Sequence, residues 1–121
     1  MTFTVRLPVP PSTNALFVTF NNRHGIERAK TKEYKAWITA AGWALNVQRP
    51  KPMKGHVRLD ISVPLNRRRD LDNHLKAILD LLVGHSLIED DRKVDDLRIQ
   101  WHVGEPEAII NCSEMFAVLQ S

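Results

Sequence analysis

The stretch that decides how this chain folds spans residues 67–76 and reads Arg-Arg-Arg-Asp-Leu-Asp-Asn-His-Leu-Lys. Three guanidinium groups in a row favour phosphate, because their planar fork of donors matches phosphate oxygens and stays charged. Two aspartates spaced i, i+2 favour a hard cation such as Mg²⁺, which takes carboxylate and phosphate oxygens together. Gathered within about one helical turn, these residue types indicate phosphodiester chemistry.

The same stretch begins a predicted helix, which runs from about Asp70 to Val83, just before Gly84. Its buried stripe consists of aliphatic residues at helical spacing, namely Leu71, Leu75, Ile78 and Leu82. At about 100° per residue, Asp72, Lys76 and Asp80 stack along one flank of that stripe. The motif is therefore predicted to lie at the edge between core and solvent, where a site is both held and open.

A second acidic cluster, Glu89-Asp90-Asp91, follows this helix within residues 84–93, which we expect to form a polar loop. Its carboxylates could complete, with Asp70 and Asp72, a cage for one or two metal ions.

Each of these features also has a plainer explanation. Asp70 would cap the helix, and the arginines would belong to a solvated loop that pairs with nearby acids. Lys76 would form i, i+4 pairs with Asp72 and Asp80, worth only tenths of a kcal/mol. These explanations do not account for all the features together.

The rest of the chain is predicted from its periodicity. Alternation of apolar and polar residues predicts strands at residues 2–7, 57–63, 97–103 and 108–119, the last with a bulge at Glu114. A helix capped by Thr31 runs to about Val47, and residues 8–30 form a long loop with room for a hairpin at its turn, residues 21–25. This order predicts a single α/β domain over residues 1–121, with a mixed β-sheet flanked by two main helices.

Composition sets the broad class. The chain has 121 residues, a net charge of +3, and 43% hydrophobic and 26% charged residues, which are ordinary values for a globular domain. One cysteine, Cys112, cannot form an internal disulfide, and no apolar run approaches the roughly 18 residues of a membrane span. The first six residues lack the pattern of a signal peptide. We expect a cytoplasmic protein without a membrane partner.

The five histidines have no metal-ligand spacing, and we expect the three tryptophans to pack in the core or at an interface.

The motif also resembles the RusA family of Holliday-junction resolvases. That family's pattern has a basic lead into Asp-Leu-Asp-Asn, then a lysine, an aspartate, and an Asp-Asp pair beyond the helix. This chain matches the pattern without a gap at Arg68–Asn73, Lys76, Asp80, Asp90-Asp91 and Val94. Residues 10–14, Pro-Pro-Ser-Thr-Asn, are similar to the family's N-terminal Pro-Pro-Ser-x-Asn, so the resemblance spans most of the protein.

The resemblance implies a crossover junction endodeoxyribonuclease, dependent on Mg²⁺ or Mn²⁺, that cuts four-way junction DNA in recombination and repair. The implied metal ligands are Asp70, Asp72 and Asp91, with Asp90 as a further candidate. Lys76 would stabilise the pentacovalent phosphate or help to activate water. The implied DNA contacts are Arg67, Arg68, Arg69 and Asn73. Small resolvases of this kind are often encoded by phages or prophages in bacteria.

The family also implies a homodimer. A four-way junction has near two-fold symmetry, and a C2 dimer presents two identical sites for two matched nicks. The apolar and aromatic residues of the loop from Val9 to Phe20, with the strands near it, are candidates for the dimer surface. Two other functions stay open from sequence, namely a junction-binding module that cleaves poorly and a nuclease that prefers flaps or other branched DNA.

Overall fold

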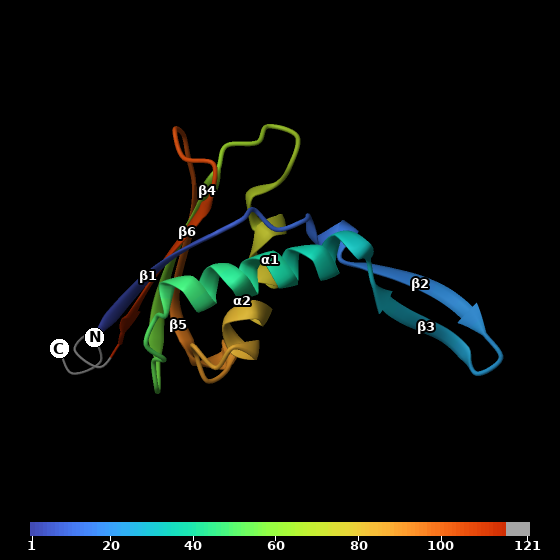
Figure 1. The fold of residues 1–121 in the computed structure, drawn as a ribbon, viewed down its shortest axis with the longest axis horizontal. Coiled ribbons are helices and arrows are strands. Elements are labelled where there is room, and N and C mark those ends of the chain that lie inside the picture. Colours follow the sequence, from blue (N-terminus) through green and yellow to red (C-terminus); the bar gives the residue numbers. More distant parts are fainter. Residues whose placement is uncertain (116–121) are drawn as a thin grey trace.

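The computed structural model describes residues 1–115, which form a four-stranded sheet, two α-helices and a separate two-stranded hairpin (Figure 1). In chain order, with 3₁₀ turns written η, the elements are β1 (Thr2–Leu7), η1 (Thr13–Ala15), β2 (Phe17–Asn22), β3 (Gly25–Lys30), α1 (Lys32–Gln48), β4 (Val57–Pro64), η2 (Leu71–His74), α2 (Leu75–Gly84), η3 (Asp91–Lys93), β5 (Val94–His102) and β6 (Ala108–Glu114). The predicted order of strands and helices is confirmed. The end of the last predicted strand, residues 116–119, lies outside the described residues.

The sheet has the strand order β1-β6-β4-β5. β4 and β5 are parallel and are joined through α2, whereas β6 is antiparallel to both β1 and β4. The prediction of a mixed sheet with two main helices is therefore confirmed. In Figure 1, α1 and α2 lie together on one side of the sheet, so the body of the protein has two layers.

One hydrophobic core fills the space between these layers. The inward residues of the strands alternate with exposed polar ones, and Val5, Leu59, Ile61 and Ile110 have no accessible surface. The helix side contributes the predicted stripe of α2, in which Ile78 and Leu82 are fully buried, while Leu71 and Leu75 are partly buried. The alternation seen in the sequence thus reports a sheet with one covered face and one polar face.

The second helix begins later than predicted, at Leu75 instead of near Asp70. The backbone of Asp70 is extended, with φ −77° and ψ 144°, and residues 71–74 form a 3₁₀ turn. His74 in this turn is 1% exposed, and its Nδ1 lies 3.2 Å from the Leu71 carbonyl oxygen. An α-helix would use that carbonyl to accept from the Leu75 N–H, which bonds to the Asp72 carbonyl instead.

The prediction of a polar loop at residues 84–93 is wrong for its centre. Leu87 is 5% exposed and Ile88 is fully buried, and the Leu87 carbonyl accepts from the Met53 N–H at 2.8 Å. Two adjacent apolar residues are too few to show a period, although they are enough to anchor a loop in the core.

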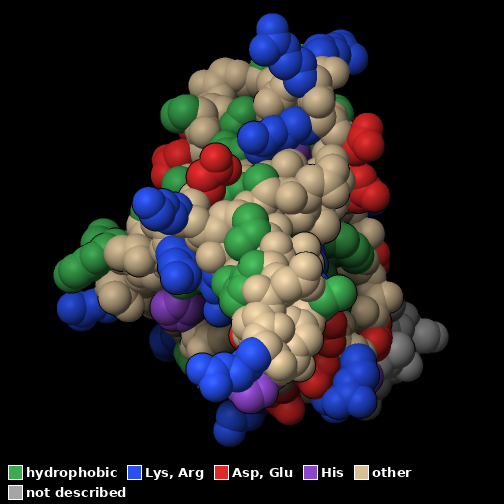
Figure 2. All heavy atoms as spheres, turned by 90° about the vertical axis from the view of Figure 1, so that its right-hand side faces the viewer, with side chains coloured by type: hydrophobic (Ala, Val, Ile, Leu, Met, Phe, Trp, Pro, Cys, Tyr) green, Lys and Arg blue, Asp and Glu red, His purple; other side chains and the backbone are tan. Residues whose placement is uncertain are grey.

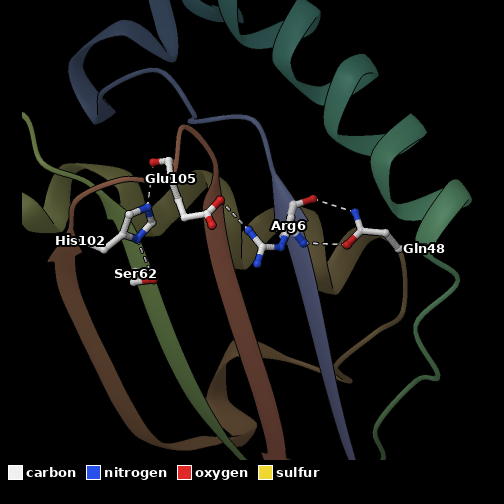
Figure 3. A network of polar contacts seen from close by, with 5 residues as sticks. All are labelled: Arg6, Gln48, Ser62, His102 and Glu105. Atoms are coloured by element: carbon white, nitrogen blue, oxygen red, sulfur yellow. Dashed lines mark hydrogen bonds and ion pairs between the residues drawn. The ribbon is translucent and has the colours of Figure 1, made fainter.

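The outer edge of β1 is covered by a side chain from the end of α1 (Figure 3). The Gln48 side-chain oxygen accepts from the Arg6 N–H, and its nitrogen donates to the Arg6 carbonyl, both at 2.7 Å. Nearby, the Arg6 guanidinium pairs with Glu105 at 2.8 Å, and His102 bridges the Ser62 hydroxyl and the Glu105 carbonyl. The Gln48 amide therefore makes the two hydrogen bonds that a neighbouring strand would make at this residue.

Neither α-helix in residues 1–115 has the length and apolarity that crossing a bilayer requires.

Candidate active site

The motif segment is held in place by the N-terminal segment. The guanidinium of Arg69 donates to the Pro10 carbonyl at 3.3 Å, and the Thr13 hydroxyl donates to the Asn73 carbonyl at 2.9 Å. Two stretches about sixty residues apart, each singled out in the sequence, therefore form one structural unit. Apart from the presence of both motifs, no signal in the sequence predicted this contact.

Asp70 and Asp72 both lie on the surface of this unit. Asp70 makes no side-chain capping bond, so the plainer explanation of Asp70 as a helix cap is wrong. The ion pairs among residues 1–115 do not include either carboxylate. Two exposed carboxylates without a cationic partner, in a segment of fixed backbone, suit a cation or a polar ligand from solution.

Lys76 pairs with Asp80 at 3.3 Å, and both side chains are about half exposed. The predicted row of Asp72, Lys76 and Asp80 along one flank of the helix is thus only partly present, because Asp72 belongs to the 3₁₀ turn and does not pair with Lys76. Tyr34 of α1 lies near Asp80. The pKa of Tyr34 is raised, first by burial and then by the negative charge of Asp80.

The second acidic cluster separates into two roles. The Asp90 carboxylate accepts from the Arg92 N–H at 2.9 Å and pairs with the Arg92 guanidinium at 3.2 Å, so it caps η3. These hydrogen bonds from Arg92 lower the pKa of Asp90. The pKa of the exposed Asp91 is raised, because its carboxyl group hydrogen-bonds to the Asp90 carboxylate and is repelled by it. Asp90 is therefore the acid of this pair that is held by Arg92.

The three predicted metal ligands are not gathered into one site. Among residues 1–115, no three histidine, cysteine, aspartate or glutamate side chains lie close enough to hold a metal ion. The topology explains this result, because Asp70 follows Pro64, the end of β4, whereas Asp91 precedes Val94, which pairs with the start of β4 at Val57. The two segments leave opposite ends of a strand that is roughly 23 Å long. The donor chemistry fits Mg²⁺ or Mn²⁺, while a cage made by one chain alone is not present.

The arginines that precede the turn differ in exposure. Arg67 and Arg68 are exposed and line an open groove of about 390 Å³ beside the loop after β4, whereas Arg69 is half-buried against Pro10. Figure 2 shows Lys and Arg side chains gathered at the top of one face, where this loop lies in Figure 1. Arg67 and Arg68 are thus free for phosphate contacts, and Arg69 also has a structural role.

A cavity of about 340 Å³ lies between α1, α2 and the base of the hairpin. Its wall includes the aromatic residues Phe17, Tyr34 and Trp37, together with Asp80 and Lys30. Because Asp80 also pairs with Lys76, the hairpin base and the motif helix meet at this cavity.

The fold and these side chains define a small α/β protein with an acidic and basic surface suited to a phosphodiester. A model of the family described as Endodeoxyribonuclease RusA matches residues 8–112. A crossover junction endodeoxyribonuclease from Enterobacteria phage HK97 is 32% identical over 93 residues, which are 77% of each chain. Proteins of the same name from Enterobacteria phage 82 and from Escherichia coli strain K12 are 33% and 31% identical over 100 residues, which are 81% of each chain. The chain belongs to the RusA endodeoxyribonuclease family.

Proposed function

We propose that this protein is a structure-selective DNA endonuclease that resolves Holliday junctions by paired, symmetric nicks. The observation that carries the proposal is the motif unit, in which Asp70 and Asp72 are exposed and unpaired beside Arg67 and Arg68. Membership of a family whose relatives are named crossover junction endodeoxyribonucleases supports it. We place its activity in the bacterial cytoplasm, in a bacterial or phage setting.

The reaction is hydrolysis of a DNA phosphodiester with a bound Mg²⁺ or Mn²⁺. Such an ion supplies Lewis-acid stabilisation of the phosphate and a water of lowered pKa. The residues that would hold it are Asp70 and Asp72, with Asp91 as a third ligand in preference to the capping Asp90. Lys76 would place its positive charge beside the phosphate as negative charge develops there. Arg67, Arg68 and Asn73 would position the backbone, which gives affinity without base specificity.

The separation of Asp91 from the other acids favours a homodimer. A two-fold partner can bring its own Asp91 to the Asp70 and Asp72 of the first chain, and the same operation completes the second site. Each junction would then meet two identical sites, as two matched nicks require. The arrangement also explains why residues 1–115 of one chain hold no group of three acids close enough for a metal ion.

Mixed dimers test this arrangement. Asp72→Asn and Asp91→Asn chains should each be inactive alone. In mixed dimers, sites shared between chains leave one site with Asp72 and Asp91 both intact, and nicking should return. If each site is made within one chain, the mixture stays inactive. Sedimentation would verify that the two chains associate.

The function itself is tested on synthetic DNA. We expect cutting of a mobile four-way junction in Mg²⁺ or Mn²⁺ and none in EDTA, with little cutting of a flap or a linear duplex. Tight junction binding without cutting in any of these ions would mean a binding module. Preferential cutting of the flap would mean a branched-DNA nuclease of another specificity.

A further inference from the structure

The β2–β3 hairpin stands away from the body of the protein as an arm (Figure 1). Its root is fixed, because Leu16 is fully buried and its carbonyl accepts from the Thr31 N–H at 3.0 Å. Beyond the root, residues 18–28 are all exposed. A two-stranded ribbon with neither face covered is marginally stable by itself. The arm therefore exposes both of its faces to a partner outside the chain.

The strand register divides the arm into two faces. Phe17 pairs with Lys30 and Thr19 with Arg28, so these four side chains lie on one face, with Asn21 and Ile26 nearer the tip. The opposite face carries Val18, Phe20, Glu27 and Ala29. The first face bears two positive charges and no acid, whereas the opposite face bears the arm's acid, Glu27.

Within residues 1–115, the cations of the arm have no acidic partner. The ion pairs within residues 1–115 do not include Arg23, Arg28 or Lys30. The guanidinium of Arg28 lies 3.8 Å from the centre of the Phe17 ring, which holds it in one place. A guanidinium whose flat face is stacked on a ring still presents its N–H donors around the edge of the guanidinium plane, and this geometry suits a phosphate.

We propose that the β2–β3 hairpin is a DNA-binding arm, with its Arg28–Lys30 face against the phosphates of one duplex arm of the junction. This inference rests on the proposed function, and it assigns a contact surface outside the motif. Residues two apart on a strand are spaced by about 6.7 Å, close to two nucleotide steps of about 3.4 Å. Arg28 and Lys30 can thus reach phosphates two nucleotides apart on one strand, and Arg23 at the turn extends the contact.

The root of the arm connects this surface to the candidate active site. Lys30 and Phe17 line the same cavity as Asp80, and Thr13, just before the arm, donates to the carbonyl of Asn73 in the motif. A duplex bound along the arm is consequently positioned relative to Asp70 and Asp72. The contact would be independent of sequence, because phosphate carries no base information.

Matched double variants test the arm. Arg28→Ala with Lys30→Ala removes two charges from its face, and Lys51→Ala with Lys54→Ala removes two exposed charges from the loop before β4. Junction affinity is measured in EDTA over a salt titration. We expect the arm variant to bind at least about 10-fold more weakly at 0.15 M salt, and the slope of log K against log salt to fall by roughly three to four, since a dimer loses four cations. The loop variant should match the wild type.

The possible results separate the arm from the proposed function. Equal slopes for the arm variant and the loop variant, while the wild type binds and cuts the junction, would overturn the arm alone. A wild type that neither binds nor cuts the junction would overturn both proposals. A dimer that dissociates in the arm variant but not in the loop variant would assign the arm to a second copy of the chain. Arg28→Lys keeps the charge and should retain most of the slope, and thermal melting identifies a variant that has not folded.

Discussion

The motif segment and the β2–β3 hairpin carry charged groups of similar exposure, but they are held in different ways. The motif segment is fixed by Arg69 on Pro10, by Thr13 on Asn73 and by the buried His74, whose ring meets that of Trp101 edge-on at 5.8 Å. Within residues 1–115, the hairpin is fixed at its root and by its own ladder. The two proposals thus assign chemistry, which needs positioned groups, to the supported backbone, and contact with a long polymer to the adjustable one.

The largest effect is expected from the supported segment. Asp70→Asn or Asp72→Asn should lower junction cutting by about 10³-fold or more, since several kcal/mol of stabilisation by the metal are lost. Binding should persist, because removing a negative charge lessens repulsion of phosphate. Single-turnover cleavage and anisotropy measure the two effects separately. Asp60→Asn, on the polar face of the sheet, is the control, and near-normal cutting by Asp72→Asn would contradict the proposed ligand.

A second contrast compares two isoleucines. Ile61→Ala in β4 should lower the free energy of unfolding by about 2–5 kcal/mol, because it leaves a cavity in the core. Ile26→Ala near the tip of the arm, where the side chain is 77% exposed, should change it by about 0.5 kcal/mol or less. Urea unfolding measures both values. A large loss of stability in Ile26→Ala would show that the arm packs against something in solution.

The closed interior of the body also predicts a pH effect. Burial raises the pKa of the Cys112 thiol from 9.0 to about 11. The thiol ionises at lower pH in the unfolded chain than in the folded protein. Its contribution to the free energy of unfolding is therefore complete below pH 9 and is lost as the pH rises toward 11. The loss approaches about 2 kcal/mol at the upper limit. Urea unfolding of the wild type and of Cys112→Ala across this range compares the pH dependence of their stabilities. Equal pH dependence in the two proteins would mean that the thiol is open to solvent.

The smallest effect is expected from the hydrogen bond that joins Thr13, just before the hairpin, to Asn73 of the motif segment. Thr13→Ala removes the hydroxyl that donates to Asn73 and should lower stability by about 1 kcal/mol. Thr2→Ala at the start of β1 removes an exposed hydroxyl and is the control. We expect Thr13→Ala to slow cutting more than Thr2→Ala does, because Thr13 supports the backbone of the motif. Equal rates would mean that this hydrogen bond is unnecessary for positioning.

Periodicity was sufficient for the layers of this fold and insufficient for its turns. Strand alternation and the Thr31 cap, whose hydroxyl accepts from the Tyr34 N–H, were predicted from local sequence because their causes are local. The 3₁₀ turn before α2 contains the buried His74 side chain, which contacts the Leu71 carbonyl, and the anchoring of Leu87 depends on a distant N–H. Contacts of this kind leave no periodic pattern in the sequence.

The residues of the candidate site were proposed from the sequence and stay a prediction, whereas their placement in the fold required the structure. The residue types at Asp70, Asp72 and Lys76 indicated phosphodiester chemistry from their spacing alone. The position of Asp91 depends on which end of β4 each segment leaves, and that follows from the pairing of Val57 with Val94. The capping role of Asp90 likewise required the turn at Arg92 to be seen.

The amide of Gln48 also limits how the protein can associate. β1 is a border strand, and an open border is a place where a foreign strand can add and begin a growing fibre. By occupying both backbone groups of Arg6, one side chain closes that starting point without adding a strand to the fold. A foreign strand therefore cannot pair with β1 along its full length unless the Gln48 amide is displaced from Arg6 first.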